Sequence, residues 1–262
     1  SFGRLANGLP SYQPMSINVI KSHEQNRGAF DNGLIQERKP IAFLNEQPVL
    51  KPFSTLFYWA HAWSPHGGTI AEHPHRGFEI CTFVIEGAIE HYDSKTNSSV
   101  VLEAGDAQIT RAGSGIRHEE KIKAGGRIFQ IWFDPNLKQS LGAEPSYEDF
   151  HASSFAVSEG LGIRTQTLVG YGSPLRMDTP TRIRRVQFQK GRHVLPLTPG
   201  HQAGALLIEG AINLGDASLE RYDFSVLTDE VDPIVDTREN ADLFLVEVPY
   251  PAPYETFVES RT

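Results

Sequence analysis

The chain has 262 residues, enough for one large domain or two small ones, each able to bury a core. With 24 Lys and Arg against 32 Asp and Glu, the formal net charge of -8 argues against a nucleic-acid-binding surface, which needs basic residues. No apolar run approaches the ~20 residues that span a bilayer, and the N-terminus lacks a secretory-type apolar segment. The single Cys81 allows no intrachain disulfide and lies in an apolar run, which predicts a buried thiol and a cytoplasmic protein.

Short apolar runs rich in β-branched and aromatic residues, bounded by turn residues, predict an all-β sandwich or barrel. In chain order the clearest are TLFYWAHAW (55–63), ICTFVIEG (80–87), RIFQIWF (127–133), ALLIEGAI (205–212) and LFLVEV (243–248). Helices are expected to be few and short. The two candidates are NLKQSLG (136–142) and SYEDFHASSF (146–155).

An internal repeat divides the chain. The sequence IEGAI occurs at 85–89 and again at 208–212, and LEAGDAQI (102–109) aligns with LERYDFSV (219–226) at nearly the same offset. Two blocks in the same order indicate a duplicated β-domain. The polar segment with Pro and Gly that follows FQIWFDPN predicts a connector. We therefore expect an N-terminal domain at 1–135, a connector at 136–159 and a C-terminal domain at 160–262.

Two His-containing pairs carry the most chemical information. His73 and His75 stand two residues apart in HPHRGFE, so in an extended strand both side chains point to one face. His118 and Glu120 repeat this spacing after a glycine-rich turn. Together they predict a site of three imidazoles and one carboxylate for a divalent transition metal, with positions left for water, O2 or substrate. The alternatives are a closed tetrahedral zinc site, or polar residues at the mouth of a strand.

The repeat provides an internal control. In the gapless overlay Pro196 and Thr198 lie over His73 and His75, and the downstream block puts Val235 and Thr237 roughly over His118 and Glu120. The β-framework therefore does not require the four polar residues, which favours a metal site confined to the N-terminal domain. On this interpretation His193 and His201 are ordinary histidines at the surface or the mouth of the second domain.

Other polar residues are weaker candidates for the metal site. If the strand is regular, Glu79 shares a face with the His pair and could bind an imidazole N–H; the alternative is a strand-end glutamate that is solvated or in a salt bridge. His61, His66 and His91 could line the cavity, although single histidines are more often structural. A local basic cluster contains Arg182, Arg184 and Arg185, for which we expect a solvated or salt-bridged strand, with an inter-domain contact as the alternative.

At these residues the sequence resembles the pirin family of the cupin superfamily. HPHRGFE followed by IEG, AGDAQITRAGSGIRHEE and FQIWFD match that family in order and spacing. Arg111 stands where the second motif of other cupins has a proline. The resemblance implies a bicupin: two tandem cupin-type antiparallel β-barrels, jelly-roll-like, with one metal in the N-terminal barrel. It implies His73, His75, His118 and Glu120 as ligands, and Fe(II) as the metal, with Zn, Mn, Ni, Co or Cu able to replace it.

The resemblance also implies an activity, the cleavage of quercetin-like flavonols with O2. In that case the partners are a small aromatic substrate and O2, and Glu120 acts as the catalytic base that accepts a hydroxyl proton. The alternative is a non-enzymatic metal- or redox-sensing regulatory protein that binds a protein partner through the same metal site. A metal-dependent isomerase is a third, weaker possibility, because cupin barrels host many chemistries.

Overall fold

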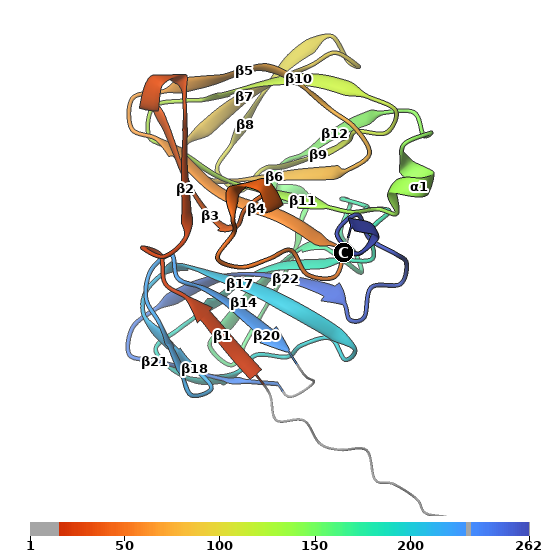
Figure 1. The fold of residues 1–262 in the computed structure, drawn as a ribbon. Helices are drawn as coiled ribbons and strands as arrows, with labels where there is room; N and C mark the ends of the chain where they lie inside the picture. The colour runs from red at the N-terminus through yellow and green to blue at the C-terminus, as the bar shows by residue number, and fades with distance from the viewer. Residues whose placement is uncertain (1–15, 229–231, 262) are drawn as a thin grey trace, which may run out of the picture.

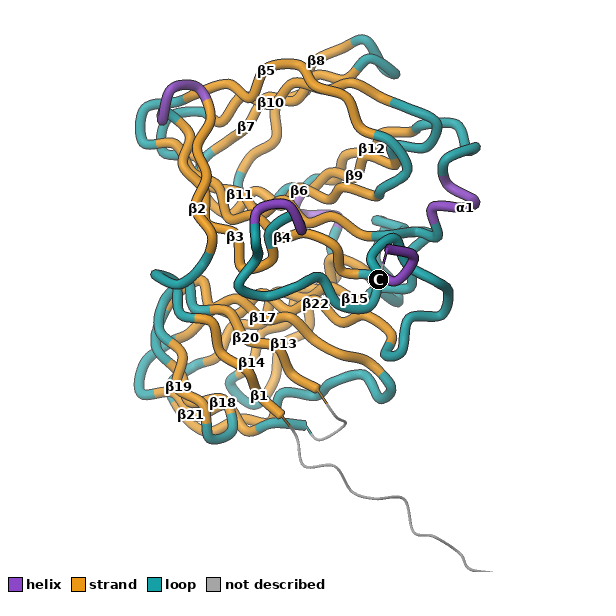
Figure 2. Tube along the Cα trace, viewed as in Figure 1, coloured by secondary structure: helices purple, strands orange, loops and turns teal. Residues whose placement is uncertain are grey.

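The computed structural model describes residues 16–228 and 232–261, and strands dominate them (Figure 2). They form two stacked β-sandwich units, each with one seven-stranded and one four-stranded sheet (Figure 1). Every pairing between these strands is antiparallel. The fold is therefore all-β and jelly-roll-like, as the sequence predicts. None of the helices found in the described residues is long and apolar enough to cross a membrane.

The first unit contains the predicted metal site. Its large sheet has, in spatial order, β12 (Ser146–Phe150), β9 (Ala107–Arg111), β6 (Glu79–Glu86), β11 (Gly126–Phe133), β4 (Leu56–Ser64), β3 (Ile35–Ile41) and β2 (Asn26–Phe30). The smaller sheet has β5 (Gly68–His75), β10 (Ile116–Ile122), β7 (Ala88–Asp93) and β8 (Ser98–Glu103). Side chains from the two facing sheets enclose the interior of this unit.

The second unit repeats the arrangement. Its large sheet has β1 (Ser16–Ile20), β20 (Phe224–Thr228), β17 (His201–Glu209), β22 (Ala241–Pro249), β15 (Arg182–Phe188), β14 (Ile163–Val169) and β13 (Ala156–Gly160). The smaller sheet has β16 (Gly191–Val194), β21 (Ile234–Thr237), β18 (Ile212–Leu214) and β19 (Ala217–Leu219). The five apolar runs predicted as strands all lie in strands of these two units.

Helical structure is short, as expected. Within residues 16–228 and 232–261 it comprises one α-helix, α1 (Leu137–Ser140), and four 3-10 turns, η1 (Asp31–Gly33), η2 (Leu44–Glu46), η3 (Ala152–Ser154) and η4 (Glu259–Arg261). The candidate helix at 136–142 is confirmed by α1, but the one at 146–155 is wrong. Its first half is β12, which pairs with β9 at the edge of the large sheet. Pairing with an available sheet edge overrides the weak helical preference of a short polar segment.

The two large sheets pack face to face through a shared aromatic core. The ring of Trp59 on β4 lies 5.1 Å from that of Phe224 and 5.7 Å from that of Phe244, between centroids. Phe129 on β11 also meets Phe244, at 5.1 Å. Cys81 on β6 is fully buried in the same core, as predicted, and burial raises the pKa of its thiol. These rings bury large apolar areas on both partners, which stabilises the contact between the units.

Strand pairing crosses the predicted domain ranges at three places, one of them where β13, almost wholly within the predicted connector, pairs with β14 in the second unit. The N-terminal strand β1 pairs with β20 in the second unit, while β12, from the predicted connector, pairs with β9 in the first. The division into domains at 1–135 and 160–262 with a connector at 136–159 stays a prediction. Strand pairing shows which strands share a sheet, and it does not show which parts of the chain fold independently.

The pairing also refines the internal overlay. The last isoleucine of the repeated IEGAI pairs with Ile122 on β10 in the first unit and with Thr237 on β21 in the second. Thr237 therefore corresponds to Ile122, and Val235, two residues earlier, corresponds to Glu120. The predicted match of Val235 with His118 is thus wrong by two residues, because the connection before β21 is shorter than the gap estimate assumed. The second unit still has no ligand residue at these positions.

Candidate metal centre

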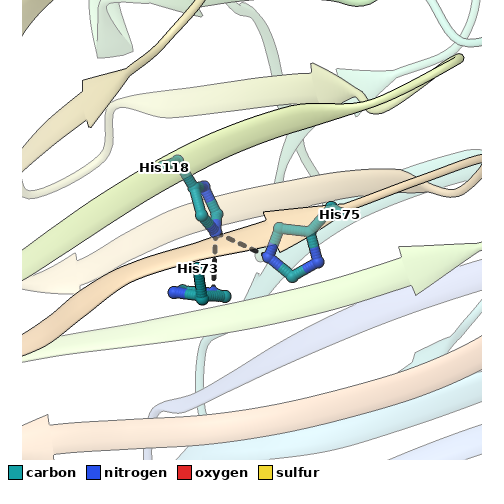
Figure 3. Close-up of side chains that lie close together, drawn as sticks. All are labelled: His73, His75 and His118. Atoms are coloured by element: carbon teal, nitrogen blue, oxygen red, sulfur yellow. Dashed lines mark hydrogen bonds between the residues drawn. The ribbon is translucent and has the colours of Figure 1, made fainter.

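Two neighbouring strands bring three histidines together. His73 and His75 alternate with Pro74 on β5, and His118 on β10 pairs directly with His73. The Nε2 atom of His118 lies 2.8 Å from Nε2 of His75 and 3.0 Å from Nε2 of His73 (Figure 3). Three imidazole nitrogens thus converge on one point inside the first unit. The i, i+2 spacing produces this convergence because alternate residues of a strand share a face.

The surroundings of each imidazole fix its orientation. The Nδ1 atom of His73 lies 2.8 Å from the carbonyl oxygen of Ala71, so a neutral ring that donates there presents a lone pair at Nε2. His118 is fully buried, and its Nδ1 has no hydrogen-bond partner. Burial, reinforced by the neighbouring imidazoles, lowers the pKa of His75 to about 2 and holds the pKa of His118 well below its usual range. The rings of His75 and His118 are therefore held neutral, the form that binds metals.

The nitrogen spacing fits a metal ion. Imidazole nitrogens bind divalent ions at roughly 2.0–2.1 Å, so two ligands at right angles lie about 3 Å apart. The observed separations of 2.8 and 3.0 Å match this value. When all three Nε2 atoms carry lone pairs, none of them can donate a hydrogen bond to the other two. A cation bound among them accepts all three lone pairs. The donor set therefore fits a divalent transition metal of the kind that the sequence predicts.

Glu120 lies beside the imidazole cluster, and its carboxylate is hydrogen-bonded to other side chains of the interior. Its carboxylate is fully buried and accepts hydrogen bonds from Gln130 Nε2 at 2.6 Å, Thr82 Oγ1 at 3.3 Å and Gln108 Nε2 at 3.4 Å. A register shift separates it from His118 on β10. Two overlapping groups have ligand atoms within 4.8 Å of one another, one of His73, His75 and His118, the other of His91, His118 and Glu120. The role of Glu120 as a fourth ligand stays a prediction.

His91 is closer to the centre than the sequence suggested. It lies in the second of these groups, and its ring stacks on Tyr147 with centroids 4.4 Å apart. Its Nδ1 atom lies 3.1 Å from Gln108 Nε2, and Tyr147 donates to Gln108 Oε1 at 3.0 Å. Burial lowers the pKa of His91. Gln108, Gln130 and Tyr147 were missed by the sequence reasoning, because no motif marks an uncharged residue that acts through a neighbour.

The orienting role of Glu79 is wrong, whereas the alternative of a salt bridge is met, because Arg111 Nε lies 3.7 Å from Glu79 Oε1. Its carboxylate accepts hydrogen bonds from the backbone N–H groups of Asp178 at 2.8 Å and Thr179 at 2.9 Å, and none from the site imidazoles. The strand does not continue regularly from His75 to Glu79, because β5 ends at His75 and the chain turns through Gly77, at a φ of 78°. Glu79 thus ties β6 to the second unit instead of orienting an imidazole.

The remaining histidine and arginine candidates lie outside the cluster. His61 is buried and contacts Arg127 Nη1 through its Nε2 atom at 2.6 Å, and His66 is exposed. His193 and His201 contact backbone carbonyls. In the basic cluster Arg184 pairs with Glu247 and Arg185 with Asp242, both within the second unit. The expected salt-bridged strand is therefore confirmed.

The second unit has a buried ion pair beside the repeat positions of His73 and His75. Arg184 Nη2 lies 2.8 Å from Glu247 Oε2, and both side chains are buried. The backbone at the repeat positions of His73 and His75 completes the network: Pro196 accepts from Arg184 at 2.6 Å, and Thr198 donates to Glu247 at 2.6 Å. One framework thus holds an imidazole cluster in one unit and a satisfied ion pair in the other.

A cavity of about 570 Å³ opens onto the cluster in the first unit. His73, His75 and Glu120 line it together with Gln130. Its aromatic wall comprises Phe30, Phe43, Tyr58 and Trp132. The Phe43 and Tyr58 rings stack with centroids 4.3 Å apart, and Trp132 meets His75 edge-on at 4.8 Å. Flat apolar walls around a small polar end are typical of sites for aromatic small molecules.

This fold and site define a bicupin with a histidine-rich group in its N-terminal unit. The Pirin family model matches residues 34–133, which contain all four predicted site residues. A pirin-like protein of Caulobacter vibrioides is 31% identical over 84% of this chain and 95% of its own. With these matches, the chain belongs to the pirin family.

Two further relatives and two solved structures extend the comparison. “Putative quercetin 2,3-dioxygenase PA1210” of Pseudomonas aeruginosa is 30% identical over 84% of this chain and 95% of its own. Pirin-like protein 2 of Arabidopsis thaliana is 33% identical, but the match spans 57% of this chain and 47% of that protein. The pirin YhhW of Escherichia coli in complex with nickel(II) has a TM-score of 0.75 and 24% identity, covering 89% of this chain and 99% of its own. A quercetin 2,3-dioxygenase of Acinetobacter baumannii has a TM-score of 0.74 and 20% identity, covering 90% and 79%. At these identities the two structures show the shared fold.

Proposed function

We propose that this protein is a metal-dependent dioxygenase that cleaves quercetin-like flavonols with O2, and that Fe(II) is its metal. The observation that carries the proposal is the convergence of three imidazole nitrogens, with His118 Nε2 within 3.0 Å of the other two, at the end of an aromatic-lined cavity. The name of the Pseudomonas aeruginosa relative supports the same reaction class. A bound Fe(II) would supply Lewis acidity and the redox capacity that chemistry with O2 requires.

The side chains of the cavity bind the metal, accept a proton and orient the substrate in this proposal. His73, His75 and His118 would hold the ion through their Nε2 atoms. The carboxylate of Glu120 accepts the hydroxyl proton of the substrate, and Gln130, whose Nε2 lies 2.6 Å from that carboxylate, holds it in position. Trp132 and Phe43, with ring centroids 5.2 Å apart, orient the flat substrate and exclude water from it.

Metal analysis combined with O2 uptake tests this proposal. The purified chain is analysed for bound metals, loaded with Fe(II), and assayed for O2 consumption against a panel of flavonoids. We expect uptake with quercetin, loss of metal in His75→Ala, and retained metal with lost turnover in Glu120→Ala. Absence of O2 uptake by the iron-loaded chain with every flavonol would contradict the proposal. Binding of a protein partner that depends on the metal would then favour a non-enzymatic regulatory role.

A further inference from the structure

The cavity has a second polar end, away from the imidazole cluster. Glu37 on β3 lines the cavity, and only 6% of its surface is exposed. Its Oε1 atom lies 3.1 Å from Lys39 Nζ, and its Oε2 atom accepts a long hydrogen bond of 3.4 Å from the Tyr58 hydroxyl. A carboxylate has about four acceptor positions, so Glu37 keeps capacity for a further donor. Burying such a group costs free energy unless it is well bonded.

The local charge specifies the kind of partner. Lys39 contacts both Glu37 and Glu46, so one ammonium faces two carboxylates and the group carries a net negative charge. An anionic ligand group is disfavoured here, whereas a neutral hydroxyl that donates a hydrogen bond is favoured. Burial raises the pKa of Tyr58 well above its usual range, which keeps its hydroxyl protonated.

The neighbouring strand holds the carboxylate in place. Gly28 on β2 pairs directly with Glu37, and a Cβ added at Gly28 would lie 2.1 Å from Glu37 Oε1. Only glycine leaves room for the carboxylate in this position. Small residues also form the floor between the two polar ends, because Ala60 and Ala62 of β4 line the cavity there. The polar end is thus built by three adjacent strands.

The register gives the separation of the two ends. Glu37 on β3 pairs with Ala62 on β4, and Ala60 on β4 pairs with Gln130 on β11. Two strand spacings of about 4.8 Å across the sheet and two residues of about 3.4 Å along it therefore separate the positions of Glu37 and Gln130, or roughly 12 Å. That span suits two linked aromatic rings lying across the alanine floor.

We infer that Glu37, with Tyr58, is a specificity-determining site that binds the hydroxyl groups on the pendant ring of a flavonol, at the end of the cavity away from the metal. The preferred ligand is then a planar aromatic molecule with hydroxyls at both ends, and a ligand hydroxylated only at the metal end binds more weakly. This inference rests on the proposed function for the orientation of the substrate.

Ligand pairs with the metal-loaded full chain test it. Dissociation constants are measured by tryptophan fluorescence quenching, since Trp132 lines the cavity, for quercetin and for galangin, which lacks the hydroxyls of the pendant ring. We expect Glu37→Gln to weaken quercetin binding about tenfold, the loss of one charge-assisted hydrogen bond, and to leave galangin binding unchanged. Gly28→Ala keeps every charge but displaces the carboxylate, so it should cause the same selective loss. Glu90→Gln on β7, outside the cavity lining, is the matched control.

The outcomes separate this inference from the proposed reaction. Equal weakening of both ligands, or an unchanged preference for quercetin in Glu37→Gln and Gly28→Ala, would overturn it even if O2 uptake continues. If the wild-type chain consumes no O2 but both variants lose the preference, the reaction fails while the hydroxyl-binding site stands.

Discussion

The ion pair in the second unit leads to a prediction about stability. Arg184 and Glu247 are 4% and 1% exposed, and the carboxylate also accepts the Thr198 N–H. Glu247→Leu leaves a buried guanidinium without a counter-charge and a backbone donor without an acceptor. Removing one partner of a buried pair costs about 3–5 kcal/mol. For a chain of this size that cost lowers the midpoint of thermal unfolding by roughly 6–20 °C.

The assay is thermal unfolding followed by circular dichroism, with metal content measured on the same samples. The double variant Arg184→Met/Glu247→Leu removes both charges and should recover much of the lost stability, because apolar pairs of similar size often replace buried ion pairs. Glu239→Leu, at an exposed position, is the control. Metal content should not change, because the pair lies in the other unit. An unaltered midpoint in Glu247→Leu, or a double variant as unstable as the single one, would refute the reasoning.

Three further predictions concern the site and its surroundings. Gln130→Leu removes the 2.6 Å donor to Glu120 and should lower kcat/KM about tenfold or more at unchanged metal content; loss of metal instead would make Gln130 a support of the ligands. Glu79→Ala leaves the N–H of Thr179 without its acceptor, so the unfolding midpoint should fall with metal content preserved, and a drop in metal content would restore the orienting role. The free energy of unfolding of metal-free protein, measured by urea titration, should fall as the pH is lowered from about 7 to about 5. Because the pKa of a buried imidazole such as His75 is depressed, only the unfolded chain takes up protons in this range, and each such imidazole lowers the stability by up to ~1.4 kcal/mol per pH unit. A stability that does not change with pH would contradict this.

The sequence predicts the class of fold and the imidazole cluster because both depend on local periodicity. Alternation along β5 and β10 places His73, His75 and His118 on interior-facing positions, and the repeated IEGAI reveals the duplication through the order of its residues alone. Short apolar runs bounded by turns correspond to strands in both units. These features need no knowledge of which strands become neighbours.

What the sequence could not show depends on long-range pairing. The orienting role considered for Glu79 fails because a turn at Gly77 interrupts the strand, and such a break cannot be read from spacing alone. Gln130 and Glu37 come from β11 and β3, and only sheet assembly brings them to the cavity. The connection before β21 shifts the repeat overlay by two residues, which only the strand register reveals. Uncharged and distant residues of a site carry no local signal.

Metal stoichiometry in single-residue variants tests the central claim, that His73, His75 and His118 hold one divalent transition metal. Elemental analysis of the wild-type chain should give one metal ion per chain. His75→Ala and His118→Ala should lose it, while His91→Asn, in the group that contains Glu120, should retain it. Metal retained in both His75→Ala and His118→Ala, or lost only in His91→Asn, would contradict the account.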